Sequence, residues 1–475
     1  MKHILCMLVC LSLLCLPCTA QTDLPSSYRS DCGLVHDQTP WGTCWAFAGI
    51  STIENRLRMD GICLSLSAEE LLWRSCGEYN QSGYGWANKS RNDGGYGLMV
   101  CGTLLNGFGA TAQELPYQTD CSELYLAEER PAKADGSLSD YRATEIVFVD
   151  GENRQEVKQA IYDYGAVATV WCEDVELSET HAYYVSDSLY TNHSVCLVGW
   201  DDDFSRENFA EPLPENNGAW LVKNSYGTDF GNYGYMWISY EDGALFSEDV
   251  AYALADYAPI GEESLLHHDE YGVTDFVPVT KAANVYPFDG WMTAVTLCTL
   301  DGKGANLMVR VAQLEENGQP TGESIVVGKA TISHNGYVTI PIECTERIVG
   351  NAALIVEFSR EVQIGVDQSL LSDSGRPVFN GLCQEGESLL YLDGQWRGCS
   401  TQGDGFNFSL RAYLSQENPV KEESTEEAES ILIEFKEEKE SKETNLFPLI
   451  LSVICFLIAT GLYVFYQQRK ESEGQ

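Results

Sequence analysis

The sequence predicts an α+β protein with two folded domains followed by a single C-terminal transmembrane helix. In the first 255 residues, a helix-like apolar run begins at Cys44, whereas the runs at 195–200 and 219–222 have the continuous apolar character of buried strands. Residues 256–415 contain short β-rich runs separated by Gly- and Asn-rich turns, which indicates a β-sandwich. A chain of 475 residues is long enough for two such cores.

The N-terminus has the features of a secretory signal peptide over residues 1–20. A short basic start is followed by the apolar stretch Ile4–Pro17 and by small residues ending at Ala20. The mature chain is therefore expected to begin near Gln21. Lipid attachment at a cysteine of this segment is disfavoured, because the residues before the candidate cysteines are not the small ones that processing favours.

Cys44 is the most informative residue of the first domain. It stands in Gln38-Thr-Pro-Trp-Gly-Thr-Cys-Trp-Ala-Phe47, between a small-residue turn and the predicted helix start. The exposed N–H groups and the dipole at a helix N-terminus both lower the pKa of a thiol. A cysteine in this position is suited to act as a nucleophile if an imidazole lies beside it. An inert buried thiol is the alternative.

Two downstream segments supply the histidine and the amide that such a site needs. His193 precedes an apolar run ending at Trp200, so the predicted strand would hold its ring against the core. Asn224 ends the next strand-like run, and its side-chain amide is expected to accept a hydrogen bond from the imidazole. Gln38, six residues before Cys44, is expected to point an amide N–H toward a developing oxyanion.

These four segments, in this order, resemble the papain-like cysteine peptidases over roughly residues 24–255. The resemblance implies a papain-like two-lobed fold and hydrolysis of peptide bonds through a Cys-His-Asn thiolate acyl-enzyme mechanism. It implies that Cys44 is the nucleophile, His193 the acid and base, Asn224 the orienting residue and Gln38 the oxyanion donor. No cofactor and no metal are expected.

The same resemblance implies three substrate-binding residues. Gly94 and Gly95 would leave room for a substrate backbone along the cleft, and Trp45 would help to form the wall of the cleft. One departure lies near the histidine, because Tyr226 stands where the family usually has a tryptophan that shields the histidine–asparagine pair. We expect activity to survive this change, with an altered pH dependence.

Residues 256–415 resemble, through less specific features, the lectin-like domain attached to bacterial cell-surface papain-like peptidases. This implies contact with cell-wall glycans as well as protein or peptide substrates. A second hypothesis is a surface adhesin that binds glycans and uses the peptidase fold as a platform. The presence of both Cys44 and His193 favours the enzyme. Acyl transfer in place of hydrolysis shares the covalent intermediate and stays open.

Twelve of the seventeen cysteines lie outside the signal peptide and the C-terminal apolar run. With one of them catalytic, an odd number remains, so at least one thiol is expected to be free. The resemblance implies one disulfide, and nearness in sequence suggests two more: Cys76 with Cys121, Cys298 with Cys344, and Cys383 with Cys399.

The chain is strongly acidic, with a formal net charge of −42, which disfavours nucleic acid as a partner. Residues 416–444 contain eleven Glu and four Lys with almost no aromatic residues. Such a segment cannot build a core, so we expect a solvated stalk. We interpret the many acidic residues of the folded part as an aid to solubility and not as a cation-binding site, because the sequence contains no EF-hand-like loop.

An uncharged apolar run over residues 446–466 is long enough to cross a bilayer, which takes about 20 residues. The acidic stalk precedes this run, and Arg469 and Lys470 follow it. The positive-inside rule therefore places the tail, residues 467–475, in the cytoplasm and the peptidase domain outside. The sequence thus predicts a single-pass protein of the cell membrane with an extracellular peptidase domain.

Overall fold

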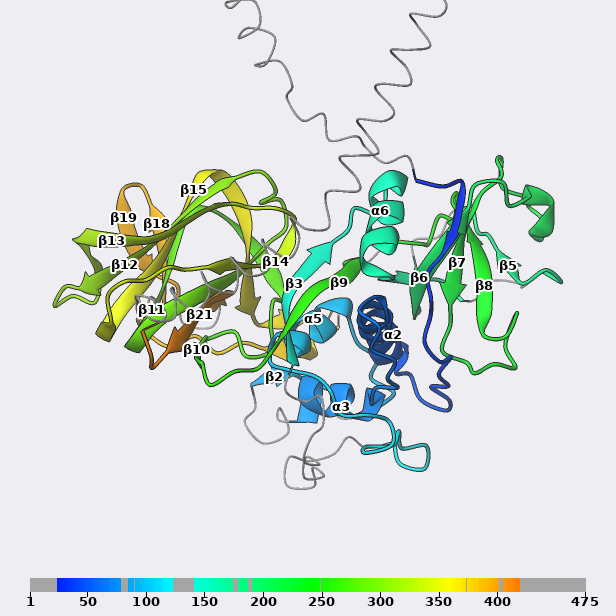
Figure 1. The fold of residues 1–475 in the computed structure, drawn as a ribbon, viewed down its shortest axis with the longest axis horizontal. Coiled ribbons are helices and arrows are strands. Elements are labelled where there is room, and N and C mark those ends of the chain that lie inside the picture. Colours follow the sequence, from blue (N-terminus) through cyan, green and yellow to red (C-terminus); the bar gives the residue numbers. More distant parts are fainter. Residues whose placement is uncertain are drawn as a thin grey trace, which may run out of the picture. The chain divides into compact units, whose positions relative to one another are not determined.

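The computed structural model describes residues 24–418 except for 78–83, 89, 123–140, 174–177, 187–189, 248, 373 and 401–404. The predicted signal peptide, most of the stalk, the apolar run 446–466 and the tail 467–475 lie outside the described residues. The described residues contain no helix with the length and apolar character needed to cross a membrane. Those up to Glu417 belong to one compact unit (Figure 1).

Most helices precede the first long strand and form one lobe of the N-terminal region (Figure 1). The sixteen-residue helix α2 begins at Cys44, as the sequence predicts, and packs against a strand of the second lobe as well as against α3 and α5. Ser67 caps α3 by accepting a hydrogen bond from the backbone N–H of Glu70. The helices are α2 (Cys44–Met59), α3 (Ala68–Leu72), the π-helix η1 (Trp73–Gly77), α5 (Gly97–Leu105), α6 (Arg154–Tyr164) and the 3₁₀ helix η3 (Arg206–Asn208).

The second lobe is a mostly antiparallel sheet, and among its described strands only the β5–β8 pair is parallel. Its strands run in the order β3, β9, β4, β6, β7, β8, β5, with β1 on the end of β6. Helix α6 packs against this sheet. The strands are β1 (Ser27–Arg29), β3 (Tyr141–Phe148), β4 (Val167–Trp171), β5 (Ala182–Tyr183), β6 (His193–Asp201), β7 (Ala219–Lys223), β8 (Tyr235–Ser239) and β9 (Tyr252–Pro259).

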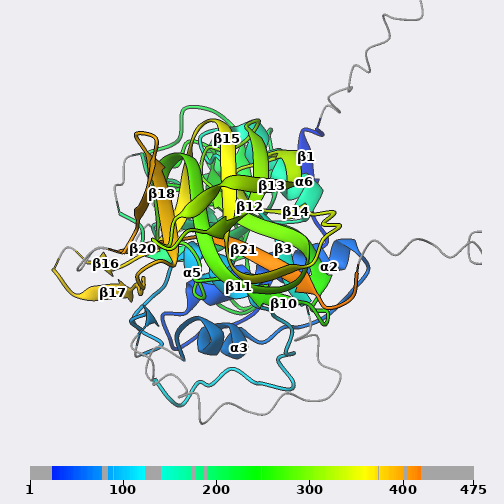
Figure 2. The same ribbon diagram turned by 90° about the vertical axis from the view of Figure 1, so that its left-hand side faces the viewer.

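The C-terminal region is built almost entirely of strands, as the β-rich runs predict (Figure 2). The first part of β11 pairs with β15, and its last part pairs with β14 and β21, so one long strand joins two sets of partners around a common apolar core. The strands are β10 (Ser264–Leu266), β11 (Asp275–Thr299), β12 (Asn306–Leu314), β13 (Pro320–Thr331), β14 (Gly336–Pro341), β15 (Ile348–Gln368), β16 (Leu370–Leu371), β17 (Pro377–Asn380), β18 (Ser388–Leu392), β19 (Gln395–Gly398), β20 (Phe406–Phe408) and β21 (Leu410–Ser415).

Backbone pairing joins the β-rich region to the N-terminal region. Strand β14 continues the sheet beyond β3, with Tyr337 opposite Ile146 and Gly336 opposite Val147. A Cβ on Gly336 would lie 2.1 Å from the carbonyl oxygen of Ile146, so this close approach requires glycine. The expected domain boundary at 255/256 falls inside β9, which runs unbroken from Tyr252 to Pro259.

A fully buried ion pair of the β-rich region includes an arginine that also contacts the helical lobe. The Arg411 Nε donates to the Asp269 Oδ1 at 3.0 Å, and both side chains are 0% exposed. The Arg411 Nη1 donates to the Oδ1 of Asn106, at the C-terminal end of α5, at 2.7 Å. The Ser409 hydroxyl donates to the other Asp269 oxygen at 2.6 Å. Arg411 of β21 is therefore bonded both within its own region and to the helical lobe.

The three predicted disulfides are wrong. Cys76 is a buried free thiol in the core of the helical lobe, whereas Cys121 is exposed on the surface. Cys298 and Cys344 are free thiols that belong to two different apolar cores. Cys383 and Cys399 are also free thiols. For Cys298 and Cys344, nearness in sequence fails because the two side chains are buried in different cores. Cys383 and Cys399 both lie next to Gly405, yet the two thiols are not bonded to each other.

Candidate active site

The N-terminus of α2 presents Cys44 beside the second lobe. Thr43 precedes the helix with φ −111°, and its carbonyl oxygen accepts from the backbone N–H groups of Ala46 and Phe47. The Thr43 side chain does not cap the helix, and its hydroxyl is hydrogen-bonded to the Tyr117 hydroxyl at 2.7 Å. Cys44 is partly exposed, while the residues that follow it are buried. The thiol therefore sits where the free N–H groups of the helix end are available.

His193 and Asn224 meet on the opposite side of the site. His193 is the first residue of β6, is 3% exposed, and has its Nε2 2.7 Å from the Asn224 Oδ1. Asn224 directly follows β7, and its Oδ1 also accepts from the Ser225 N–H at 2.8 Å. Because that oxygen is an acceptor in both contacts, Nε2 carries a proton and Nδ1 is the nitrogen left to interact with Cys44.

The electrostatic environment favours a charged thiol–imidazole pair. Burial opposes ionisation of Cys44, but the hydrogen bond and the positive charge of His193, with a contribution from Ser194, bring the pKa of the thiol below its ordinary value. Burial likewise opposes charging of His193, yet Cys44, Asn224 and Glu173 raise the pKa of the imidazole above its ordinary value. The two shifts are those of a thiolate and an imidazolium that stabilise each other.

Gln38 is held in a fixed orientation next to the Asn224 segment. Its Oε1 accepts from the Ser225 hydroxyl at 2.7 Å, and its Nε2 donates to the carbonyl oxygen of Trp41 at 3.0 Å. The backbone N–H of Gln38 donates to the Ser225 carbonyl at 2.8 Å, and the side chain is 5% exposed. One N–H of the side-chain amide is therefore used locally, and the second remains as a donor.

Gly94 and Gly95 each have a structural reason to be glycine. Gly94 has φ +77°, with open space where a Cβ would be, and its carbonyl oxygen accepts from the Asn88 side chain at 2.7 Å. A Cβ on Gly95 would lie 2.4 Å from the Trp45 ring. Trp45 itself is 2% exposed, so it supports this segment from beneath instead of presenting its ring to the cleft.

The β-rich region supports the same segment from behind. Strand β17 pairs with β2 (Gly85–Trp86), placing Phe379 opposite Trp86. The Phe379 and Trp86 rings make an edge contact at 5.0 Å, and Trp86 contacts Tyr96, the residue after Gly95, at 5.8 Å. Phe379 and Trp86 are 0% and 1% exposed. A buried aromatic chain thus leads from β17 to the glycine pair.

Two residues next to His193 complete the site, and only one of them stands out in the sequence. The Tyr226 ring is stacked on the imidazole, with centroids 4.9 Å apart and planes at 17°. Its hydroxyl donates to Glu173 and lies 3.4 Å from the His193 Nδ1. The Glu173 Oε2 is 3.9 Å from the same nitrogen. Glu173 carries no local motif, and its position follows only from the pairing of β4 with β6, which sets Trp171 opposite His193.

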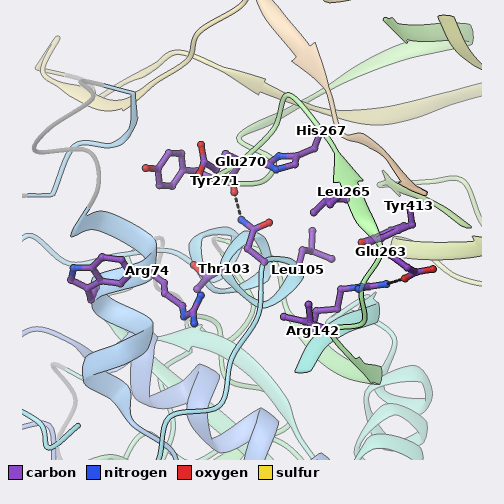
Figure 3. Close-up of a pocket in the computed structure, with 13 residues that line it drawn as sticks. Arg74, Thr103, Leu105, Arg142, Glu263, Leu265, His267, Glu270, Tyr271 and Tyr413 are labelled. Carbon is purple, nitrogen blue, oxygen red and sulfur yellow. Dashed lines mark hydrogen bonds and ion pairs between the residues drawn. The ribbon is translucent and has the colours of Figure 1, made fainter. Parts of the chain in front are cut away.

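A separate cavity of about 290 Å³ lies at the junction with the β-rich region (Figure 3). Its charged side chains are already engaged: Arg142 pairs with Glu263 at 3.1 Å and lies 4.1 Å from the centre of the Tyr413 ring. Burial, together with the nearby Arg411, lowers the pKa of His267 to about 4. Neither Cys44 nor His193 lines this cavity, so it is distinct from the candidate active site.

Comparison with known proteins agrees with this geometry. Residues 20–253 match the papain family of cysteine proteases. Cathepsin B-like cysteine proteinase 3 of Caenorhabditis elegans is 26% identical over 287 residues, covering 54% of this chain and 70% of that protein. Fruit bromelain of Ananas comosus is 25% identical over 211 residues, covering 42% of this chain and 50% of bromelain.

Two solved structures extend the similarity into the β-rich region. The clostridial cysteine protease Cwp84 after propeptide cleavage has a TM-score of 0.71 and 26% identity, covering 83% of this chain and 100% of that one. The cysteine protease and lectin-like domains of Cwp84, a surface layer associated protein of Clostridium difficile, give a TM-score of 0.68 and 25% identity, covering 83% and 89%. Residues 20–253 therefore form a papain-family cysteine protease domain, and the predicted resemblance is confirmed.

Proposed function

We propose that this cysteine protease is a membrane-anchored extracellular endopeptidase that works through a covalent acyl-enzyme. One observation carries the proposal: Cys44, at the start of α2, lies next to His193, and the Nε2 of His193 is 2.7 Å from the Oδ1 of Asn224. The same proposal assigns the ranges 21–255, 256–415, 416–444 and 446–466 to separate functional parts, with β9 running across the first of these boundaries.

In the proposed reaction, the Cys44 sulfur attacks the carbonyl carbon of the scissile peptide bond. The oxyanion that forms is stabilised by the backbone N–H of Cys44 and by the remaining amide N–H of Gln38. His193 gives its Nδ1 proton to the leaving amine, and the C–N bond breaks to leave a thioester. The imidazole then takes a proton from water, which attacks the thioester and restores the thiolate. Asn224 keeps the imidazole in the required orientation.

The substrate backbone is proposed to lie along Gly94 and Gly95. The open space beside Gly94 and the support of Gly95 by the buried Trp45 favour a firm, unobstructed cleft wall. The β-rich region is proposed to be lectin-like and to contact cell-wall glycans, which is supported by its similarity to the clostridial protein with lectin-like domains. An adhesin without activity is the weaker alternative, because Cys44 and His193 are both present and paired.

Selective alkylation tests the role of Cys44. Treated with limiting iodoacetamide at pH 6, the protein is expected to be modified first at Cys44, since an ordinary thiol is almost fully protonated there. Cys63 is the internal control because it is an exposed free thiol. If accessibility alone set the rate of alkylation, Cys63 would be labelled at least as fast as Cys44. Burial raises the pKa of Cys196 to about 12, so this thiol should react last. Equal rates at Cys44 and Cys63, read by peptide mass spectrometry, would count against the thiolate.

Protease shaving of intact cells tests the proposed topology. If residues 446–466 anchor an extracellular protein, cleavage within the acidic segment 416–444 should release a soluble active fragment. A tag placed after Gln475 should stay protected until the cells are opened. Retention of the fragment on shaved cells, or digestion of the tag on unbroken ones, would show that the orientation is wrong.

A further inference from the structure

The carboxylate of Glu173 lies beside the reactive edge of His193 and is held there by defined contacts. Its backbone N–H donates to the Asn192 Oδ1 at 2.9 Å, which ties the end of β4 to the residue before His193. Its carboxylate accepts from the Tyr226 hydroxyl, and its Oε2 is 3.9 Å from the His193 Nδ1. The side chain nevertheless remains 36% exposed, so it faces both the imidazole and the solvent.

Glu173 lies near the imidazole nitrogen of His193 that exchanges protons in the proposed reaction. The Nε2 of His193 is engaged with Asn224, which leaves Nδ1 as the nitrogen that exchanges a proton with the reacting groups. In the proposed mechanism this nitrogen protonates the leaving amine. A carboxylate 3.9 Å from Nδ1 therefore lies next to the amine and to the residue attached to it.

We propose that Glu173 is a specificity-determining residue that favours a cationic side chain, Lys or Arg, directly after the scissile bond. A partly exposed carboxylate attracts a positive group and repels a negative one, and its proximity to the departing residue makes the effect selective for that position. Tyr226 would act as a positioning residue, since its hydroxyl holds the carboxylate while its ring is stacked on the imidazole. The inference rests on the proposed roles of Cys44 and His193.

A purely structural role for Glu173 is the competing explanation. In that case the carboxylate serves only to hold Tyr226 over the imidazole. The variant Glu173→Gln separates the two explanations, because its amide oxygen still accepts from the Tyr226 hydroxyl while the negative charge is gone. Tyr226→Phe is the reciprocal variant, since it keeps the stacked ring and loses the hydrogen bond to Glu173.

The test uses the full-length protein and four peptides that differ only in the residue after the scissile bond: Lys, Arg, Ala or Glu. At low ionic strength, the wild type is expected to cleave the Lys peptide with a kcat/KM about fivefold or more above that of the Glu peptide. The ratio should fall in high salt, because exposed charges are screened. Glu173→Gln should bring the ratio close to one, because the charge that distinguishes the two peptides is gone.

Glu316→Gln is the matched control, because Glu316 is an exposed carboxylate in the turn between β12 and β13. It should leave the Lys-to-Glu ratio of the wild type unchanged. An unchanged ratio in Glu173→Gln, or no preference in the wild type, would overturn the inference. If instead no peptide is cleaved and Cys44 is not selectively alkylated, the proposed function itself has failed, so the two failures are distinguishable.

The pH profile provides a readout that a purely structural role would not move. The titratable groups that face His193 among the described residues are Cys44, Glu173 and Tyr226, with Tyr183 behind Trp171. Burial and the hydrogen bond to Glu173 raise the pKa of Tyr226, so its hydroxyl stays neutral. Glu173 favours the protonated imidazole, so Glu173→Gln should move the alkaline limb of kcat/KM to lower pH. If the alkaline limb of kcat/KM in Glu173→Gln stays at the pH found for the wild type, the charge of Glu173 does not act on His193 as proposed.

Discussion

Replacing Cys44 with alanine is expected to abolish peptide hydrolysis, with kcat falling by at least about 10⁴-fold. The proposed acyl-enzyme needs a sulfur at the start of α2, and alanine cannot form that bond. His193→Ala should lose nearly as much, because the thiolate and the imidazolium act as a unit. Gln38→Ala should be milder, since loss of one oxyanion donor costs about 10²–10³-fold in kcat. Steady-state kinetics on one peptide, chosen from a library by mass spectrometry, compares all three variants.

Two controls make the Cys44 result interpretable. Cys63→Ala removes an exposed thiol and should retain full activity. The thermal unfolding midpoint of Cys44→Ala should match that of the wild type, because alanine is a good helix former at the start of α2. Normal turnover by a folded Cys44→Ala protein would show that the nucleophile has been assigned to the wrong residue.

Replacing Arg411 with methionine is expected to lower the free energy of unfolding by about 3–5 kcal/mol. The substitution leaves the Asp269 carboxylate buried, with the Ser409 hydroxyl still bonded to it but without its cation. It also removes the hydrogen bond to Asn106, so the β-rich region and the helical lobe should be weakened together. Urea unfolding followed by fluorescence and by circular dichroism should show one transition, shifted to lower urea.

The cause of that loss can be isolated with two further variants. The double variant Arg411→Met with Asp269→Leu removes both charges and should recover part of the lost stability, because an unpaired buried charge is then absent. Arg397→Met breaks an exposed pair with Asp393 of similar length, 3.0 Å, and should change stability little. A double variant no more stable than Arg411→Met would mean that packing, and not the unpaired charge, dominates.

The candidate site could be predicted from the sequence to the extent that its signals are local. A small-residue turn before an apolar run marks Cys44, and α2 does begin there. Histidine and asparagine at the ends of strand-like runs mark His193 and Asn224, which the structure brings within hydrogen-bonding distance of each other. The catalytic roles of these residues stay predictions. Glu173 could not be found in this way, because no spacing rule relates it to His193.

The composition of the β-rich region predicts strands but not their partners. The sequence contains the runs that form β12, β14 and β15, yet nothing in it indicates that β14 pairs with β3, nearly 200 residues earlier. Pairing at this separation depends on how the whole sheet packs and not on local preference. The wrong pairing of Cys298 with Cys344 has the same origin, since these residues belong to different cores despite lying on consecutive parts of the chain.

The pairing of β3 with β14 bears on where the chain can be cut. Strand β3 is covered by β9 on one side and in part by β14 on the other, so it is not a free sheet edge. A protein ending at residue 255 would uncover that edge, shorten β9 and expose the buried face of Trp86. Open strand edges recruit strands from other molecules, and such a fragment would tend to self-associate. Residues 24–418 are thus the smallest piece that we would choose for expression, inhibitor screening or crystallisation.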